Sequence, residues 1–351
     1  MNEGRAHPGA PARQRRVVAA FDKFRASASA GDLNEVVARL ARARDVACDV
    51  VRVSDGGEGF AGAFGATTVT VMTRGPLGEE RWAPITLDSS HGDLVGVFGA
   101  SDVVGRDLLE HPRPHEALAA TSEGVGTLIL AAARLGARRV IVGCGGTATS
   151  DAGRGCYDVL RGAGGLPVPV TVATDVTADF FGARRYAVQK GVREDDLALI
   201  DQRLEDARAL YLEESHVDVG PLARSGAGGG IAGALAALGA QLASGFDLVA
   251  RAQGLDEHLA GAALVVTGEG RLDAGSLEGK VVLEVAKRTP PSCGLLVVCG
   301  SLDDEVAAAL GERFANARFV SLSARWPERA LSATLSCVDD VVTEALDDAG
   351  L

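Results

Sequence analysis

Residues 262–281, AALVVTGEGRLDAGSLEGKV, decide the fold of this chain. The segment begins with small and β-branched apolar residues at 262–266, which predict a short strand buried on both faces. An amphipathic helical pattern begins at Val281. Between the two lies a glycine-rich loop that carries four charged residues: Glu269, Arg271, Asp273 and Lys280. Open α/β sheets bind their ligands at such strand ends, but an ordinary βα loop with solvated charges explains the segment equally well.

The same alternation of strand and helix patterns occupies both ends of the chain. Near the N-terminus we expect strands at 16–21 and 46–53, separated by a helix that runs through residue 43 and is capped by Asp32. Near the C-terminus, strands and helices alternate in this order: strand 263–267, helix 279–288, strand 294–299, helix 303–314, strand 318–321 and helix 334–348. The two ends together therefore predict one discontinuous parallel sheet.

The middle of the chain has a different pattern. Segments between 67 and 101 alternate as antiparallel strands do, with turn signals between them, and a long helix is expected at 116–136. The predicted fold class is α/β: a discontinuous Rossmann- or flavodoxin-like parallel-sheet domain with an inserted second α/β domain. The expected division is a disordered leader at 1–16, a parallel-sheet domain at 17–72 plus 258–351, an inserted domain at 73–257, and an active site in the cleft between the two domains.

Composition excludes several classes of function. The chain has 351 residues and a net charge of −12, without the basic surface that a general nucleic-acid or anionic-membrane binder needs. The six cysteines form no CxxC pair or metal-type spacing, which is typical of a reducing cytoplasm. No apolar segment reaches membrane-spanning length without interruption. We therefore expect a cytoplasmic protein with a small-molecule partner, no nucleic acid or membrane partner, and a possible homo-oligomeric state.

Known phosphate-binding motifs fit the sequence poorly. Residues 275–280 have too few positions between their glycines for a Walker A loop, and Val281 stands where that motif requires Ser or Thr. Residues 228–233, GGGIAG, satisfy GxGxxG, but no strand precedes them, which disfavours a dinucleotide fold. These glycines either offer backbone N–H groups to an anion at a helix N-terminus or allow close packing of the helix. Both explanations are open.

Two further patterns are candidates for binding. The loop 145–153, GGTATSDAG, combines hydroxyl groups with backbone donors at a helix start, which suits phosphate or a carboxylate, or simply a well-capped turn. Carboxylates recur in pairs after predicted strands, as Asp55 with Glu58 and as Glu269 with Asp273. Such pairs suit Mg²⁺ together with substrate phosphates or a general base for a hydroxyl. Each pair alone is also explained as solvated charge.

Six motifs occur along the chain in a fixed order. They are FDKFRAS (21–27), SDGGEGF (54–60), GGTATSDAG (145–153), TDV with a later QKG (174–176 and 189–191), SGAGGGIAGAL (225–235) and TGEGRLDAGSLEGK (267–280). In this order they resemble the patterns of the bacterial glycerate kinase family, class I: DSFKGS, ADGGEGT, GGSATNDGG, CDVxNPL…PQKG, GAGAAGG and TGEGRxD…GK. The resemblance implies two α/β domains with the active site between them, and phosphorylation of a hydroxyl of glycerate by ATP with Mg²⁺.

The resemblance also implies roles for individual residues. It suggests a catalytic set of Asp175, Lys190, Arg271, Asp273 and Arg25. It suggests a nucleotide-binding set of Gly145, Gly146, Thr147, Thr149, Gly228, Gly229, Gly230, Gly268, Glu269 and Lys280. Asp55 and Glu58 would act through a metal ion or water. Either Asp273 or Asp175 would be the carboxylate nearest the acceptor hydroxyl, and Arg271 would hold a carboxylate or phosphate through its bidentate guanidinium.

The chain departs from the family pattern at two places. The lysine of the first motif is replaced by Arg25, and Lys23 stands where the pattern has serine. The Asn-Pro-Leu of the middle motif is replaced by Ala178, Asp179 and Phe180. Arginine and lysine are not interchangeable at a close phosphate site. The altered middle motif leaves open a different small hydroxy acid as the acceptor. The changes at Arg25 and Ala178 leave open a nucleotide-binding regulatory protein that has lost turnover.

Overall fold

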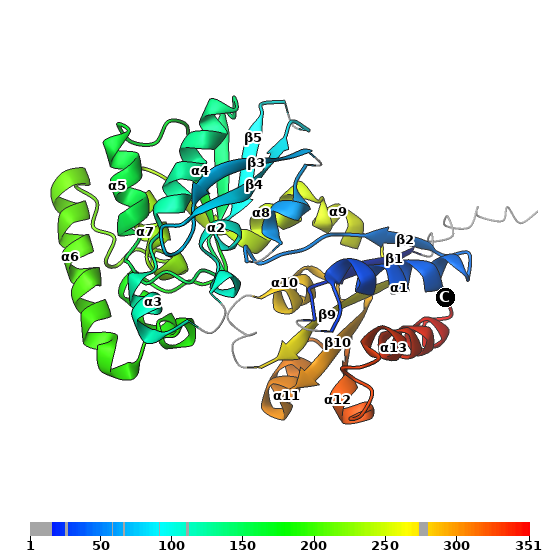
Figure 1. Cartoon of the computed structure of the whole chain (residues 1–351). Helices are drawn as coiled ribbons and strands as arrows, with labels where there is room; N and C mark the ends of the chain where they lie inside the picture. The colour runs from blue at the N-terminus through cyan, green and yellow to red at the C-terminus, as the bar shows by residue number, and fades with distance from the viewer. Residues whose placement is uncertain are drawn as a thin grey trace, which may run out of the picture. The chain divides into compact units, whose positions relative to one another are not determined.

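The computed structural model describes residues 16–24, 27–57, 59–65, 67–90, 92–109, 112–273 and 280–351. The chain divides into two compact units (Figure 1). Unit 1 comprises Met1–Arg52, Gly254–Leu277 and Val281–Leu351, and unit 2 comprises Val53–Gln253 and Glu278–Lys280. The sequence pattern placed the first boundary near residue 72. The division falls earlier because the strand that begins at Thr67 pairs within the sheet of unit 2.

Unit 1 is built on a five-stranded parallel sheet with the order β11-β10-β9-β1-β2. Its strands are β1 (Arg16–Phe21), β2 (Ala47–Val50), β9 (Leu264–Leu272), β10 (Gly294–Leu302) and β11 (Ala317–Ser321). Its helices are α1 (Ala30–Arg42), α9 (Leu255–Leu259), α10 (Val281–Arg288), α11 (Asp304–Arg313), α12 (Leu322–Arg325) and α13 (Thr334–Asp348). Phe21, Leu33 and Val338 belong to one buried cluster, so α1 and α13 pack against the sheet there.

The start of α1 differs from the prediction. The Ser29 Oγ accepts a hydrogen bond from the Asp32 backbone N–H at 3.1 Å, so Ser29 is the N-cap residue. Asp32 lies in the first turn, where its negative charge still complements the helix dipole. Both serine and aspartate cap helices well. Ser29 is the cap here because the helix begins at Ala30, directly after it.

Strand β9 is longer than predicted. It continues through Leu272 because β10 also continues, and the register pairs Glu269 with Cys299 and Arg271 with Ser301. Glu269 and Arg271 are therefore strand residues and do not lie in the loop that the sequence pattern indicated. Asp273 follows the last paired residue.

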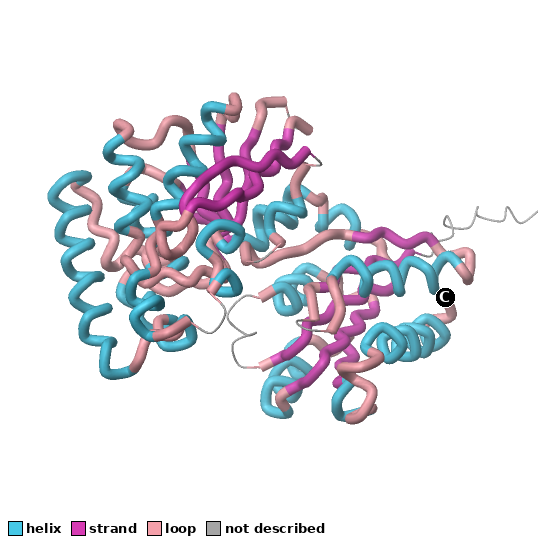
Figure 2. The backbone as a smooth tube through the Cα atoms, viewed as in Figure 1, coloured by secondary structure: helices cyan, strands magenta, loops and turns pink. Residues whose placement is uncertain are grey.

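Unit 2 is built on a six-stranded sheet with the order β3-β4-β5-β6-β7-β8. Figure 2 draws the strands of both sheets in magenta. Its strands are β3 (Thr67–Arg74), β4 (Glu80–Asp88), β5 (Val95–Gly99), β6 (Arg139–Gly143), β7 (Val170–Thr174) and β8 (Gln241–Ser244). The first three strands pair antiparallel and the last four pair parallel. The antiparallel pattern predicted for the middle of the chain is therefore confirmed, and it occupies one half of a mixed sheet.

The helices of unit 2 connect these strands. The α-helices are α2 (Ser101–Val104), α3 (Pro114–Ala119), α4 (Glu123–Arg134), α5 (Arg154–Gly162), α6 (Leu197–Ser215), α7 (Ile231–Ala237) and α8 (Gly245–Ala252). The 3₁₀ turns are η1 (Phe60–Ala63), η2 (Arg106–Leu108), η3 (Phe181–Tyr186), η4 (Val188–Lys190), η5 (Glu194–Asp196) and η6 (Ala227–Gly229). Helices α4, α5 and α7 contribute to one buried cluster with the sheet, and η1 and α8 contribute to another.

The long helix predicted at 116–136 is broken into α3 and α4. The Thr121 N–H donates to the Pro76 carbonyl at 2.8 Å, and the N–H and hydroxyl of Ser122 donate to an Asp151 carboxylate oxygen at 2.8 and 2.7 Å. These bonds take both residues out of the helical hydrogen-bond pattern. Periodicity alone does not reveal them, because Asp151 lies in a different loop of the unit.

The predicted α/β fold class is confirmed, with a discontinuous parallel sheet in unit 1 and a second α/β unit inserted in the chain. Within the described ranges, no helix has the length and apolar character needed to cross a membrane.

Candidate active site

The carboxyl ends of β6 and β7 hold most of the predicted site residues of unit 2. The two strands are parallel neighbours, and the Cys144 N–H beyond β6 donates to the Ala173 carbonyl of β7 at 2.8 Å. This contact brings Gly145 beside Asp175, the first residue after β7. A Cβ atom at Gly145 would lie 2.8 Å from the Asp175 Oδ2, so only glycine fits there.

The loop that carries Asp55 packs against the same strand ends. The Gly145 N–H donates to the Gly56 carbonyl at 3.2 Å, and the Gly57 N–H donates to the Asp55 Oδ1 at 3.0 Å. Gly56 has φ of +103°, and a Cβ atom there would lie 3.1 Å from the Ala173 carbonyl oxygen. Asp55 and Asp175 are therefore held near one another by backbone contacts between their loops.

The Asp175 carboxyl has an altered pKa. Its pKa is raised to about 6, first because the group is removed from solvent and second because Asp55 carries a like charge. The positive charges of Lys190 and Lys280 act in the opposite direction. Lys280, the last charged residue of the 262–281 segment, belongs to unit 2 by its contacts, and its charge acts on Asp175.

Lys190 is a buried cation at the end of η4. It is only 6% exposed, and its ammonium donates to the Thr149 carbonyl at 2.7 Å and to the Thr147 hydroxyl at 3.2 Å. Burial lowers its pKa to about 8, against the favourable charges of Asp151 and Asp175. The side chain is therefore predominantly charged at neutral pH, in a region with little water to screen it.

The glycine run 228–230 packs closely against the 145–153 loop. All three glycines have positive φ, of 66°, 71° and 99° in order. A Cβ atom at Gly229 would lie 2.0 Å from the Thr149 carbonyl oxygen, and the Thr149 hydroxyl donates to the Gly228 carbonyl at 3.0 Å. Close packing, one of the two explanations left open by the sequence, accounts for these glycines. Binding of an anion by their N–H groups stays a prediction.

The predicted site residues of unit 1 lie along the end of β9. A Cβ atom at Gly268 would lie 2.0 Å from the Val298 carbonyl oxygen, which explains this glycine by sheet packing. The side chain of Glu269 is buried. The Arg271 Nε lies 3.3 Å from the Asp273 Oδ2, and their side chains are 78% and 37% exposed. Arg25 and Glu58, and the loop residues 274–279, lie outside the described residues.

Two arginines that sequence reasoning missed contact the loops and strand ends that carry the predicted site residues of unit 2. The Arg106 N–H donates to the Gly146 carbonyl at 2.9 Å, and its charge contributes to lowering the pKa of Lys190. The Arg224 guanidinium donates to the Thr174 hydroxyl at 3.1 Å, and its backbone has φ of +74°, which is rare for a residue with a side chain. No motif covers Arg106. Arg224 directly precedes the 225–235 motif, which was the only available signal.

The described residues contain no group of three or more His, Cys, Asp or Glu side chains arranged to hold a metal ion. In the candidate site, Asp55 and Asp175 are two carboxylates whose charges act on one another.

A buried cation beside two carboxylates and glycine-rich loops, at the carboxyl ends of parallel strands, defines a site suited to phosphoryl transfer. The family model described as "Glycerate kinase family" matches residues 17–163 and 166–346. The chain therefore belongs to the glycerate kinase family and is a phosphotransferase of the kinase type. The resemblance identified from the six motifs is confirmed.

Individual relatives agree with this assignment. The chain is 33% identical over 335 residues to Glycerate 2-kinase of Escherichia coli strain K12, with 83% of this chain and 86% of the relative covered. It is 28% identical to Glycerate kinase of Neisseria meningitidis serogroup B, with 83% and 87% covered. A crystal structure from Salmonella typhimurium LT2, designated glycerate kinase 2, matches with a TM-score of 0.74 and 26% identity over 96% of this chain and 99% of that one.

Proposed function

We propose that this protein transfers the terminal phosphoryl group of ATP to a hydroxyl of glycerate and forms phosphoglycerate. Membership of the glycerate kinase family supports the acceptor. The name of the Escherichia coli relative supports the 2-hydroxyl as the position phosphorylated. A cytoplasmic location and a small-molecule acceptor belong to the same proposal, because both substrates are small metabolites.

The observation that carries the proposal is the buried charge of Lys190. Phosphoryl transfer needs little covalent chemistry from the protein, but it needs neutralisation and alignment of phosphate charge. Lys190 is held by Thr147 and Thr149 in the loop that the resemblance assigns to the nucleotide. A lysine that keeps its charge while buried suits a site that receives an anion. Lys280 adds a second positive charge near Asp175.

Asp175 suits the role of general base for the acceptor hydroxyl. It stands at a parallel strand end, beside the loop with Gly145, and its pKa of about 6 is near the operating pH that favours proton transfer. Asp273, the other carboxylate that the sequence suggested, is more than a third exposed and lies beside Arg271. We therefore assign proton acceptance to Asp175 and keep substrate binding for Arg271.

The residues of unit 2 fit the magnesium ion that the resemblance implies. Mg²⁺ prefers hard oxygen ligands and is held by one or two carboxylates plus substrate phosphates and water. Burial and, second to it, the like charge of Asp55 raise the pKa of Asp175, and a cation would relieve the repulsion between the two carboxylates. Asp55 would hold the ion, which when bound would supply positive charge to the phosphates of ATP.

A second acceptor is favoured by one observation. The segment in which this chain differs from the family pattern is hydrogen-bonded to the backbone around Arg224. The Arg224 N–H donates to the Thr177 carbonyl at 3.1 Å, and the Gly226 N–H donates to the Ala178 carbonyl at 3.3 Å. Phe180 is fully buried, with its ring centroid 6.2 Å from that of Tyr211. Since this segment follows Asp175, a change in it reshapes the surroundings of the acceptor. The alternative is therefore a kinase for another small hydroxy acid.

A coupled assay of ADP release tests both acceptors. Glycerate, glycolate, lactate and tartrate are each supplied with ATP and Mg²⁺, and the position of the phosphate in the product is read by ³¹P NMR. We expect turnover of glycerate at its 2-hydroxyl. Turnover of another acid alone would establish the alternative. No turnover of any acid, with an ATP analogue still bound in calorimetry, would replace both with a nucleotide-binding regulatory protein.

A further inference from the structure

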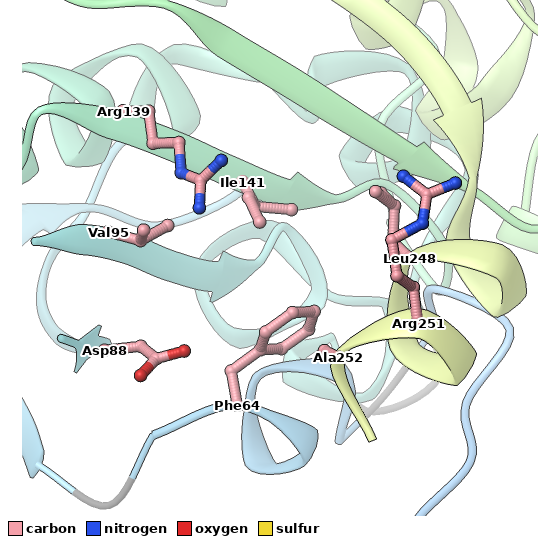
Figure 3. A pocket seen from close by; sticks show the side chains of 8 residues that line it. All are labelled: Phe64, Asp88, Val95, Arg139, Ile141, Leu248, Arg251 and Ala252. Atoms are coloured by element: carbon pink, nitrogen blue, oxygen red, sulfur yellow. The ribbon is translucent and has the colours of Figure 1, made fainter. Parts of the chain in front are cut away.

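Unit 2 contains a cavity whose lining includes none of the candidate active-site residues (Figure 3). It has a volume of about 200 Å³. It is lined by Phe64, Asp88, Val95, Arg139, Ile141, Leu248, Arg251 and Ala252. Val95 and Arg139 are the first residues of the parallel strands β5 and β6. The cavity therefore lies at the amino ends of these strands, whereas Gly145 and Asp175 follow carboxyl ends.

The charges at this cavity are unbalanced. Arg139 comes from β6 and Arg251 from α8, and their side chains stand on opposite sides of the space in Figure 3. Among the described residues, neither guanidinium has a hydrogen-bond or ion-pair partner. Asp88 carries the one negative charge of the lining, and its carboxylate accepts hydrogen bonds from the N–H and hydroxyl of Ser90 at 2.9 and 2.6 Å. The lining therefore keeps one net positive charge.

The rest of the lining is apolar. Val95 and Ile141 of the sheet belong to one buried cluster, against which Phe64 and Leu248 pack. Figure 3 shows the Phe64 ring and the Ile141 side chain bordering the space between the two arginines. Concave apolar surface with a few convergent polar groups is the usual composition of a small-molecule site. The volume is below the roughly 300–1,000 Å³ of sites for drug-sized ligands, so it suits a smaller molecule.

We propose that this cavity binds a small organic monoanion with a compact apolar body and a single carboxylate. The apolar body would contact Phe64, Ile141 and Leu248. The carboxylate would accept hydrogen bonds from Arg139 and Arg251, because a guanidinium fork matches the geometry of a carboxylate. One negative charge balances the net charge of the lining.

The cavity is connected to the candidate active site through its walls. Turn η1, which leads to Phe64, begins shortly after the Asp55 loop. Helix α8, which carries Leu248 and Arg251, begins at Gly245, where a Cβ atom would lie 2.2 Å from the Asp55 carbonyl oxygen. A ligand that shifts either wall also bears on Asp55. We therefore expect the KM for ATP to change when the cavity is occupied. This expectation rests on the proposed function, whereas the binding of the monoanion to the cavity does not.

Isothermal titration calorimetry on the full chain tests the binding. The probe is benzoate, compared with its neutral analogue benzamide and with acetate, which lacks the apolar body. We expect saturable binding of benzoate that is at least about tenfold tighter than that of either comparison, because both the charge and the apolar contacts are needed. Arg251→Ala and Arg139→Ala should each weaken benzoate binding about tenfold or more.

Two further variants separate the site from general effects. Arg138→Ala removes the neighbouring exposed arginine, which does not line the cavity, and should leave binding unchanged. Ala252→Leu should abolish binding by filling the space while keeping both arginines. The proposal is overturned if benzoate does not bind, if benzamide binds equally well, or if the two cavity arginines matter no more than Arg138. An unchanged KM for ATP in benzoate-saturated, active protein would overturn the connection to Asp55.

Discussion

The end of β9 in unit 1 and the ends of β6 and β7 in unit 2 carry similar residues in different surroundings. At β9, Arg271 and Asp273 lie close together and remain in contact with solvent. Beside the ends of β6 and β7, Lys190 of η4 is almost fully buried and Asp175 has a raised pKa. Residue type alone does not distinguish the two strand ends. The comparison teaches that burial, supplied by the glycines that let the loops approach, is what alters the chemistry of a charged group.

Removing the two candidate bases is the strongest test of this comparison. Asp175→Asn should lower kcat by about 10³-fold, within the range expected for loss of a general base. Asp273→Asn should lower it by much less, because Asp273 is more exposed. Both variants are measured by ADP release, with circular dichroism as the check on folding. If Asp273→Asn proves the more damaging change, the base lies at the end of β9 and the assignment is reversed.

Lys190→Met should lower kcat/KM by about 10²-fold or more, because it removes the buried charge that we propose to stabilise the transferring phosphate. Methionine keeps much of the length and lets the side chain stay buried. Lys287→Met is the matched control, since Lys287 is paired with Glu284 on the surface, and it should change activity less than about twofold. Equal activity of the two variants would remove Lys190 from the chemistry.

Gly229→Ala tests whether close loop packing creates the surroundings of Lys190. We expect it to lower the free energy of unfolding by about 2–4 kcal/mol, because φ is positive and the new Cβ would meet the Thr149 carbonyl. Gly311→Ala, in helix α11 with open space around it, should instead raise that free energy by about 0.5–1 kcal/mol. Urea unfolding measures both. If Gly229→Ala left the free energy of unfolding unchanged, the loops that carry Gly229 and Thr149 would not need to pack this closely.

The lowered pKa of Lys190 predicts opposite pH trends for activity and stability. Activity should fall about tenfold between pH 7 and pH 9, because the ammonium is lost above its pKa of about 8. Between about 8 and the ordinary value of 10.5, the unfolded chain binds more protons at this residue than the folded chain does. The contribution of this residue to stability therefore rises with pH in that window.

Comparing pH profiles isolates this residue from others that titrate. In Lys190→Met the residual activity should be flat from pH 7 to pH 9, while Lys287→Met should keep the wild-type profile. The same fall in Lys190→Met as in wild type would assign the titration to another group.

Local patterns were sufficient for much of the fold. The alternation of strand and helix signals at both ends predicted the discontinuous sheet, because buried parallel strands are short apolar runs whatever lies beside them. Details that depend on a partner element were missed. Strand β9 extends to Leu272 because β10 accompanies it, and the helix expected at 116–136 breaks where Ser122 bonds to Asp151.

The sequence by itself determined the family, through six motifs in order, and it named Lys190, Asp175 and Asp55 as site residues. Only the tertiary structure decided that Lys190 is buried, because its acceptor at Thr149 is 41 residues away along the chain. Only the tertiary structure also revealed the position of Arg106, which no motif covers, and the cavity between Arg139 and Arg251. Periodicity and motifs are local properties. Burial, a pKa and a cavity arise from groups that only the folded chain brings together.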